Sequence, residues 1–118
     1  MNLKFIQQFS LVLTINILVV TFSFGQKIHI SDYESAADLT AFIVDYESRA
    51  DLLVYKVDYE SQAGENNGKW FFVDYRSQSD KSIFFVEYES KADIKIYFVD
   101  FESQAGWINK TKMQFLDQ

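Results

Sequence analysis

Short apolar runs alternate with a repeated polar phrase along most of the chain. The runs are rich in β-branched and aromatic residues, and polar segments bound each of them. Such runs are too short for stable helices, and their composition favours β-strands. The predicted strands are residues 28–30, 41–44, 52–57, 70–73, 83–86 and 94–99.

The polar phrase is Asp-Tyr-Glu-Ser-x-Ala-Asp, and it occurs six times with few changes. Successive copies begin 13, 13, 16, 13 and 13 residues apart, so we expect a fold that uses one small unit six times. Alternation continues from Val57 through Tyr59 to Ser61, which predicts that the tyrosine of each phrase faces the core. The Ser and the final Asp are expected to bond to backbone amides of their own turn. The copies begin at Asp32, Asp45, Asp58, Asp74, Glu87 and Asp100.

A second, longer repeat relates two halves of the chain, about 27–68 and 69–110. A shift of 42 residues places Lys27 on Lys69, and the third phrase of each half ends in Ser-Gln-Ala-Gly. Between the halves, the Asn67-Gly68 pair is a strong turn signal. We therefore expect an all-β fold with pseudo-two-fold symmetry. Stacked hairpins, a solenoid-like coil and a small wound barrel all agree with the spacing.

Residues 1–25 differ in composition from the rest of the chain. Lys4 precedes an uncharged apolar stretch, and the small residues Ser23 and Gly25 occupy the third and the first position before a cut ahead of Gln26. This is the three-part pattern of a signal peptide, whereas a membrane anchor would favour a longer apolar stretch with a basic flank. We expect cleavage before Gln26, no membrane span in the mature chain, and one exported domain at 26–118, located in the periplasm or outside the cell.

Charge and composition narrow the class of partner. The formal net charge is −6, and removal of residues 1–25 would take away Lys4 and leave −7. An acidic surface argues against nucleic acid and anionic membranes as partners. The chain has no cysteine and therefore no disulfide bond, while its aromatic content of 18% without proline argues against disorder. We expect the partner to be a protein or a glycan of the cell envelope, and we expect no cofactor.

The repeated phrase and the two Ser-Gln-Ala-Gly ends resemble a family of small bacterial proteins with the 7(1) septoil knot domain. The resemblance covers about residues 27–115, with mild departures such as Arg76 in place of Glu and Phe101 in place of Tyr. It implies a β-rich chain wound as a seven-crossing torus knot, against the general rule that folds are unknotted. It implies no activity, so no functional residue is transferred. Slow unfolding of such a knot would stabilise the domain in place of disulfides.

Pairs of acidic residues recur in the phrase as Asp-x-Glu. On a strand, residues i and i+2 share a face, so the two carboxylates of a pair could lie about 5–7 Å apart. Pairs at such distances can bind Ca²⁺ or act as a general acid and base. Equivalent copies do not form one tuned catalytic site, so the simplest interpretation is a solvated acidic face. The Ca²⁺ candidates are Asp45, Glu47, Asp58, Glu60, Asp100 and Glu102.

The remaining candidates are single residues and the aromatic rings. His29 is the only histidine and lies between two isoleucines, so neither a Ser-His-Asp triad nor a transition-metal site is expected. The aromatic rings of the phrases could stack on sugars, although core packing is the simpler interpretation for a small domain. Trp107 has no counterpart in the first half, and we expect it to be exposed and take it as a ligand-binding candidate. The tail, 112–118, is expected to pack against the domain.

No acidic pair differs from its own copies elsewhere in the chain in a way that would make it a tuned site. We therefore expect a non-catalytic, kinetically stable structural or interaction module of the cell envelope or exterior, which resists unfolding and proteolysis. The alternative is a module that binds Ca²⁺ or a glycan through the acidic residues and exposed aromatic rings.

Overall fold

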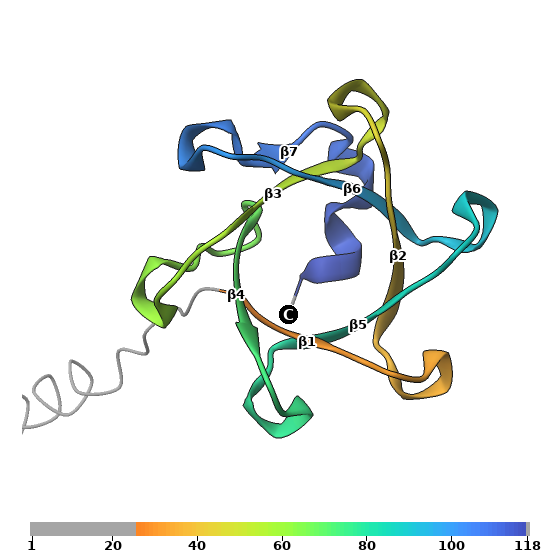
Figure 1. Cartoon of the computed structure of the whole chain (residues 1–118), viewed down its shortest axis with the longest axis vertical. Coiled ribbons are helices and arrows are strands. Elements are labelled where there is room, and N and C mark those ends of the chain that lie inside the picture. The colour runs from red at the N-terminus through yellow and green to blue at the C-terminus, as the bar shows by residue number, and fades with distance from the viewer. Residues whose placement is uncertain (1–25, 118) are drawn as a thin grey trace, which may run out of the picture.

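The computed structural model describes residues 26–117, and the predicted signal peptide at 1–25 lies outside this range. Strands and 3₁₀ helices alternate along the described chain (Figure 1). Each predicted run coincides with a strand to within about two residues, so the strand predictions are confirmed. The strands are β1 (Gln26–Ile30), β2 (Leu39–Ile43), β3 (Leu52–Lys56), β4 (Lys69–Val73), β5 (Lys81–Phe85), β6 (Ile94–Phe98) and β7 (Gly106–Trp107). The 3₁₀ helices are η1 (Glu34–Ala36), η2 (Glu47–Arg49), η3 (Glu60–Gln62), η4 (Arg76–Gln78), η5 (Glu89–Lys91), η6 (Glu102–Gln104) and η7 (Lys110–Leu116).

Strands β1–β6 form one closed barrel in which every neighbouring pair is parallel. The order around the ring is β4-β1-β5-β2-β6-β3, and pairing of β3 with β4 closes it. The short strand β7 adds antiparallel to another part of β3. Of the three arrangements that agree with the repeat spacing, the small wound barrel is the one observed.

The chain passes around this barrel twice. Strands β1, β2 and β3 leave gaps between them on the first pass, and β5 and β6 fill these gaps on the second (Figure 1). Equivalent strands of the two halves are therefore neighbours, because β1 pairs with β4, β2 with β5, and β3 with β6. The halves are related by a step of one strand around the barrel axis, which differs from the half turn that the duplication led us to expect.

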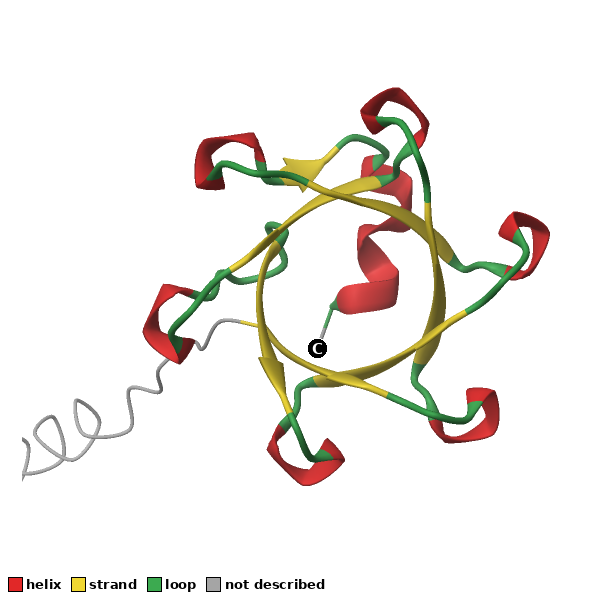
Figure 2. Cartoon of the chain, in the orientation of Figure 1, coloured by secondary structure: helices red, strands yellow, loops and turns green. Residues whose placement is uncertain are grey.

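Each polar phrase leaves the barrel as a projecting segment with one short 3₁₀ helix, which we call an arm (Figure 2). The strands end before the phrase, so the prediction that strand alternation continues to the tyrosine is wrong. The cause is local hydrogen bonding, because the Arg49 amide donates to the Tyr46 carbonyl at 3.1 Å and turns the chain. The arms pass outside strands of the other half, and those of η1 and η4 pack on β5 and β1. The six arms are residues 31–38, 44–51, 57–68, 74–80, 86–93 and 99–105.

One inward-facing residue from each repeat forms a layer across the middle of the barrel. All six are 0% exposed and belong to one core cluster. Because β2 and β4 lie three strands apart in a ring of six, Ala41 and Trp70 come from opposite sides of the axis, and the small side chain leaves room for the large one. This middle layer consists of Ile28, Ala41, Val54, Trp70, Ile83 and Ile96.

The C-terminal helix η7 covers the amino ends of the strands, and Figure 2 shows it inside the ring. Leu116 is fully buried in the core cluster, and its carbonyl accepts a hydrogen bond of 2.8 Å from Nε2 of Gln26, at the start of β1. Nζ of Lys112 donates to the carbonyl of Asp93, which directly precedes β6. The prediction that the tail packs against the domain is confirmed.

The joint between the two halves depends on Gly68. Its φ is +86°, and a Cβ atom there would lie 2.3 Å from the carbonyl oxygen of Leu53. Only glycine fits this backbone conformation and close approach. The expected turn at Asn67-Gly68 is therefore present, and it directs the chain from the arm of η3 into β4.

Candidate functional site

The aromatic residue of every phrase lies at the surface of its arm. The six side chains are 64–72% exposed, so the interpretation that they face the core is wrong. The arms radiate from the barrel in different directions (Figure 1), so the exposed aromatic residues belong to six separate projections around it. We call them the arm aromatics: Tyr33, Tyr46, Tyr59, Tyr75, Tyr88 and Phe101.

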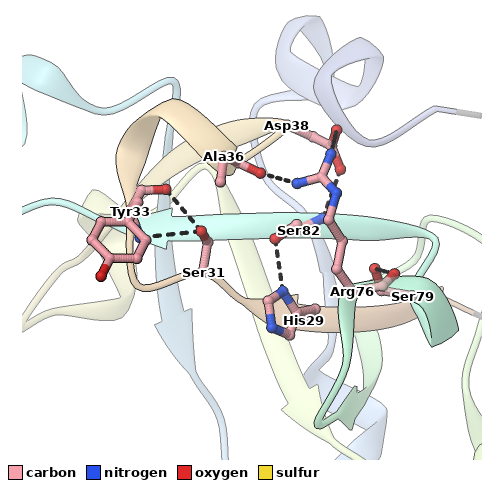
Figure 3. A network of polar contacts seen from close by, with 8 residues as sticks. All are labelled: His29, Ser31, Tyr33, Ala36, Asp38, Arg76, Ser79 and Ser82. Atoms are coloured by element: carbon pink, nitrogen blue, oxygen red, sulfur yellow. Dashed lines mark hydrogen bonds and ion pairs between the residues drawn. The ribbon is translucent and has the colours of Figure 1, made fainter.

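Local hydrogen bonds hold the backbone of the arms and leave the aromatic rings free. The hydroxyl of Ser31 donates to the Tyr33 carbonyl at 2.7 Å and accepts from the Tyr33 amide at 3.2 Å (Figure 3). In the arm of η3, Oε1 of Gln62 accepts from the Tyr59 amide at 3.2 Å. These contacts satisfy the backbone on either side of an extended residue, so its ring needs no packing to stay in place.

The final aspartate of four phrases joins each arm to the neighbouring strand. The Asp51 carboxylate accepts a hydrogen bond from the Lys95 amide at 2.8 Å, while the Asp51 amide donates to the Lys95 carbonyl at 2.7 Å. These partners lie 44 residues apart, so the expectation that the final Asp bonds within its own turn is wrong. The same two-point contact, which we call the aspartate clamp, recurs at Asp38, Asp80 and Asp93.

Ion pairs connect the arms to one another and to the barrel. Arg49 of one arm contacts Glu89 of another at 2.5 Å, and Arg76 reaches Asp38 at 3.2 Å and the carbonyl of Ala36 (Figure 3). All of these side chains are at least partly exposed, so each pair contributes at most about 1 kcal/mol. The pairs therefore fix arm orientation more than they stabilise the fold. Two further pairs, Lys27–Glu60 and Lys69–Glu102, occupy equivalent positions in the two halves.

The acidic pairs proposed for Ca²⁺ lie on three separate arms. Each Glu opens a 3₁₀ helix instead of sharing a strand face with its Asp. Glu60 and Glu102 form ion pairs with lysines at 3.3 and 3.1 Å. Within residues 26–117, no three side chains of His, Cys, Asp or Glu type are grouped closely enough to hold a metal ion. The structure therefore separates the three acidic pairs from one another: Asp45 with Glu47, Asp58 with Glu60, and Asp100 with Glu102.

Trp107 and His29 both take part in internal hydrogen bonds. The Trp107 ring is half-buried against the core cluster, and its Nε1 donates to the backbone and side-chain oxygens of Asn66 at 3.0 and 2.9 Å. Trp107 therefore has only part of its ring available to a ligand. Nδ1 of His29 lies 2.9 Å from the Ser82 hydroxyl on the outside of the barrel (Figure 3).

A shallow surface groove of about 470 Å³ lies where β1, β4 and two arms meet. Glu60 is the one member of the proposed acidic pairs that lines this groove, and its carboxylate forms an ion pair with Lys27. The one paired acid in the groove therefore already has a basic partner, 3.3 Å away. The groove is lined by Lys27, Glu60, Phe71, Phe72, Val73, Asp74 and Gln78.

Two features of the arms were missed by sequence reasoning. The exposed tyrosines carry a signal in the sequence, because each follows an acidic residue and precedes Glu-Ser or Arg-Ser, which is typical of a projecting turn. The aspartate clamps carry no such signal, because the bonded amide belongs to a different repeat and is identified only once the strand order is known.

Comparison with known proteins gives a family and no individual relative. No curated protein matches the chain, and no solved structure matches it. Among residues 26–117, no helix has the length and apolar composition required to cross a bilayer. Residues 25–108, which include all six arms and β1–β6, match the family described as the 7(1) septoil knot domain. The chain therefore belongs to the 7(1) septoil knot domain family.

Proposed function

We propose that the protein is an exported, non-catalytic interaction module that contacts a partner in the cell envelope or exterior through its arm aromatics. The observation that carries this proposal is the exposure of all six rings at 64–72% on arms that radiate from one barrel. A small domain gains stability by burying aromatic rings, so a fold that leaves one exposed in every repeat gives up that contribution.

Repetition of the arms favours binding to an extended or repetitive partner. Six equivalent contacts on one rigid domain raise the total binding strength well above that of one arm, without any single strong site. Phe101 occupies the sixth position without a hydroxyl group and is as exposed as the tyrosines. The shared feature is therefore the ring, which contacts a partner through its flat face.

A glycan polymer is one candidate for this repetitive partner, and the residues on either side of each arm aromatic favour it. Each arm aromatic stands between an acidic residue and a Glu or Arg, so hydrogen-bonding groups flank an apolar face. Sugars present the complementary combination of C–H faces and hydroxyl groups. Replacing the tyrosines by phenylalanine would keep ring stacking and remove hydroxyl contacts, which separates the two contributions.

Export and a knotted chain form the second part of the proposal. The composition of residues 1–25 supports export. Interleaved strands from the two passes, with arms lying outside strands of the other half, support a knot. A knotted chain must unthread before it unfolds fully, so it would persist in a protease-containing environment without disulfides.

The arm proposal predicts that removing rings weakens binding without unfolding the protein. A variant with Tyr46, Tyr59 and Tyr75 changed to alanine should lose at least about tenfold in retention by isolated cell-wall material, because half of the multivalent contacts are gone. Retention is measured by co-sedimentation of the purified protein with the wall material. Its thermal midpoint should stay close to that of the wild type, because these side chains are exposed.

The matched control is Ile108→Ala, which removes an exposed apolar side chain outside the arms. It should bind as the wild type does. Retention of the triple variant at the wild-type level would show that the arm aromatics are not the contact surface.

A further inference from the structure

The carboxyl end of the barrel exposes a second layer of inward-facing residues. They follow the middle layer by two positions along each strand, so they share its orientation toward the axis. Five of the six are apolar, and three of these are strongly exposed: Ile30 at 47%, Ile43 at 46% and Phe98 at 37%. We call this layer the mouth; it consists of Ile30, Ile43, Lys56, Phe72, Phe85 and Phe98.

The two ends of the barrel are therefore covered unequally. Helix η7 closes the amino end and brings Leu116 into the core. Within residues 26–117, no equivalent segment follows at the carboxyl end, where the rings of Phe72 and Phe98 meet with centroids 6.5 Å apart. Nζ of Lys56 lies 5.8 Å from the centroid of the Phe72 ring and places the one charge of the layer at its side. The result is a contiguous apolar surface, which in soluble domains commonly marks a contact site.

Acidic residues surround this apolar surface. Two positions beyond each mouth residue, the first residue of every phrase is an exposed Asp or Glu. None of the six forms an ion pair with another residue of the described range, 26–117, whereas Arg49, Lys69 and Arg76 are paired elsewhere. The combination is an apolar centre inside a ring of free negative charge. This acidic rim consists of Asp32, Asp45, Asp58, Asp74, Glu87 and Asp100.

We propose that the mouth docks an apolar side chain carried by a basic segment of a partner protein. The apolar layer supplies a surface that gains from being covered, and the acidic rim attracts Lys and Arg residues on either side of the inserted side chain. A second copy of this chain is a poorer occupant, because docking two mouths would bring two acidic rims together. The mouth is a different surface from the arm aromatics, so the inference does not depend on the function proposed for the arms.

The test uses the full chain and two synthetic peptides, both lysine-rich, with either one central leucine or a serine in its place. Binding is measured by fluorescence anisotropy of the labelled peptide at low and at physiological salt. The leucine peptide should bind about tenfold more tightly than the serine peptide, because only leucine covers the mouth. Binding of both peptides should weaken as salt rises, because the rim acts through exposed charges.

Two matched variants locate the site. Ile43→Asn places an amide in the mouth and should remove the preference for leucine, while Ile108→Asn changes an exposed isoleucine outside the barrel and should preserve it. Sedimentation without peptide reports whether the chain pairs with itself. The proposal is overturned by equal binding of the two peptides, by an unchanged preference in Ile43→Asn, or by a dimer that Ile43→Asn dissociates.

Discussion

Replacement of Trp70 by alanine should lower the free energy of unfolding by about 3–5 kcal/mol, the largest effect expected for any single residue. Trp70 is fully buried, and its ring fills the barrel beside Ala41, Phe72 and other members of the core cluster. Strands on all sides are joined by backbone hydrogen bonds, so the wall cannot collapse into the space left by the indole.

Urea unfolding, approached from both the folded and the unfolded side, measures this loss and shows whether equilibrium was reached. Trp70→Phe is the informative second variant, because the indole Nε1 of Trp70 has no hydrogen-bond partner in the core and phenylalanine removes that buried donor. It should therefore cost less than Trp70→Ala. Phe101→Ala is the control, with a change within about 0.5 kcal/mol. An equal loss in Trp70→Ala and Phe101→Ala would contradict the assignment of the middle layer.

Replacement of Asp51 by alanine should lower the free energy of unfolding by about 2–3 kcal/mol, because a charged acceptor is lost and a backbone donor remains unpaired. Asp51 is buried, and its carboxylate holds the Lys95 amide at the start of β6. Its second oxygen accepts from Nδ2 of Asn109, which leads into η7. One side chain therefore joins an arm, a strand and the segment that closes the barrel.

Hydrogen exchange of the Lys95 amide separates this local effect from a general loss of stability. In Asp51→Ala, this amide should exchange faster than its neighbours in β6 under native conditions. Asp51→Asn keeps a neutral acceptor and should lose less stability than alanine. Asp45→Ala, on the exposed acidic rim, is the matched control and should leave both stability and exchange unchanged. Uniform exchange across β6 in Asp51→Ala would argue against the clamp.

The strands could be predicted from the sequence because the residue types of each run are those that burial within the barrel requires. Runs such as 70–73 and 83–86 are short, apolar and β-branched or aromatic, and both faces of most of these strands are at least partly covered. The order of the strands could not be predicted in the same way. Pairing of β1 with β4 and β5 depends on the path of the arms, and residue spacing is equally compatible with hairpins or a coil.

The arm aromatics show where the period-two pattern misleads. Val57, Tyr59 and Ser61 alternate as a strand would, yet η3 begins at Glu60 and turns the chain away from the barrel. Local 3₁₀ hydrogen bonds decide the conformation there, and they depend on the Asp-Tyr-Glu-Ser phrase instead of on apolar spacing. The mouth was missed for the opposite reason, because Ile30, Ile43 and Phe98 look like ordinary core positions until the uncovered end of the barrel is known.

The most direct test of the double winding is to join the two ends of the chain covalently and to measure whether the joined chain contains a knot. Gln26 and Leu116 are in hydrogen-bond contact, so the ends of the described chain lie side by side. The native chain has no cysteine, so a chain expressed without residues 1–24 and carrying Gly25→Cys and Gln118→Cys can form only one intramolecular disulfide. The disulfide is formed once in the folded protein and once in the fully unfolded chain, and the hydrodynamic radius of both products is then measured in urea without reductant.

If the double winding knots the chain, a disulfide formed in the folded protein prevents the knot from untying in urea. The product closed in the folded state should then have a clearly smaller hydrodynamic radius than the chemically identical product closed in the unfolded state. Equal radii would show that the chain is not knotted.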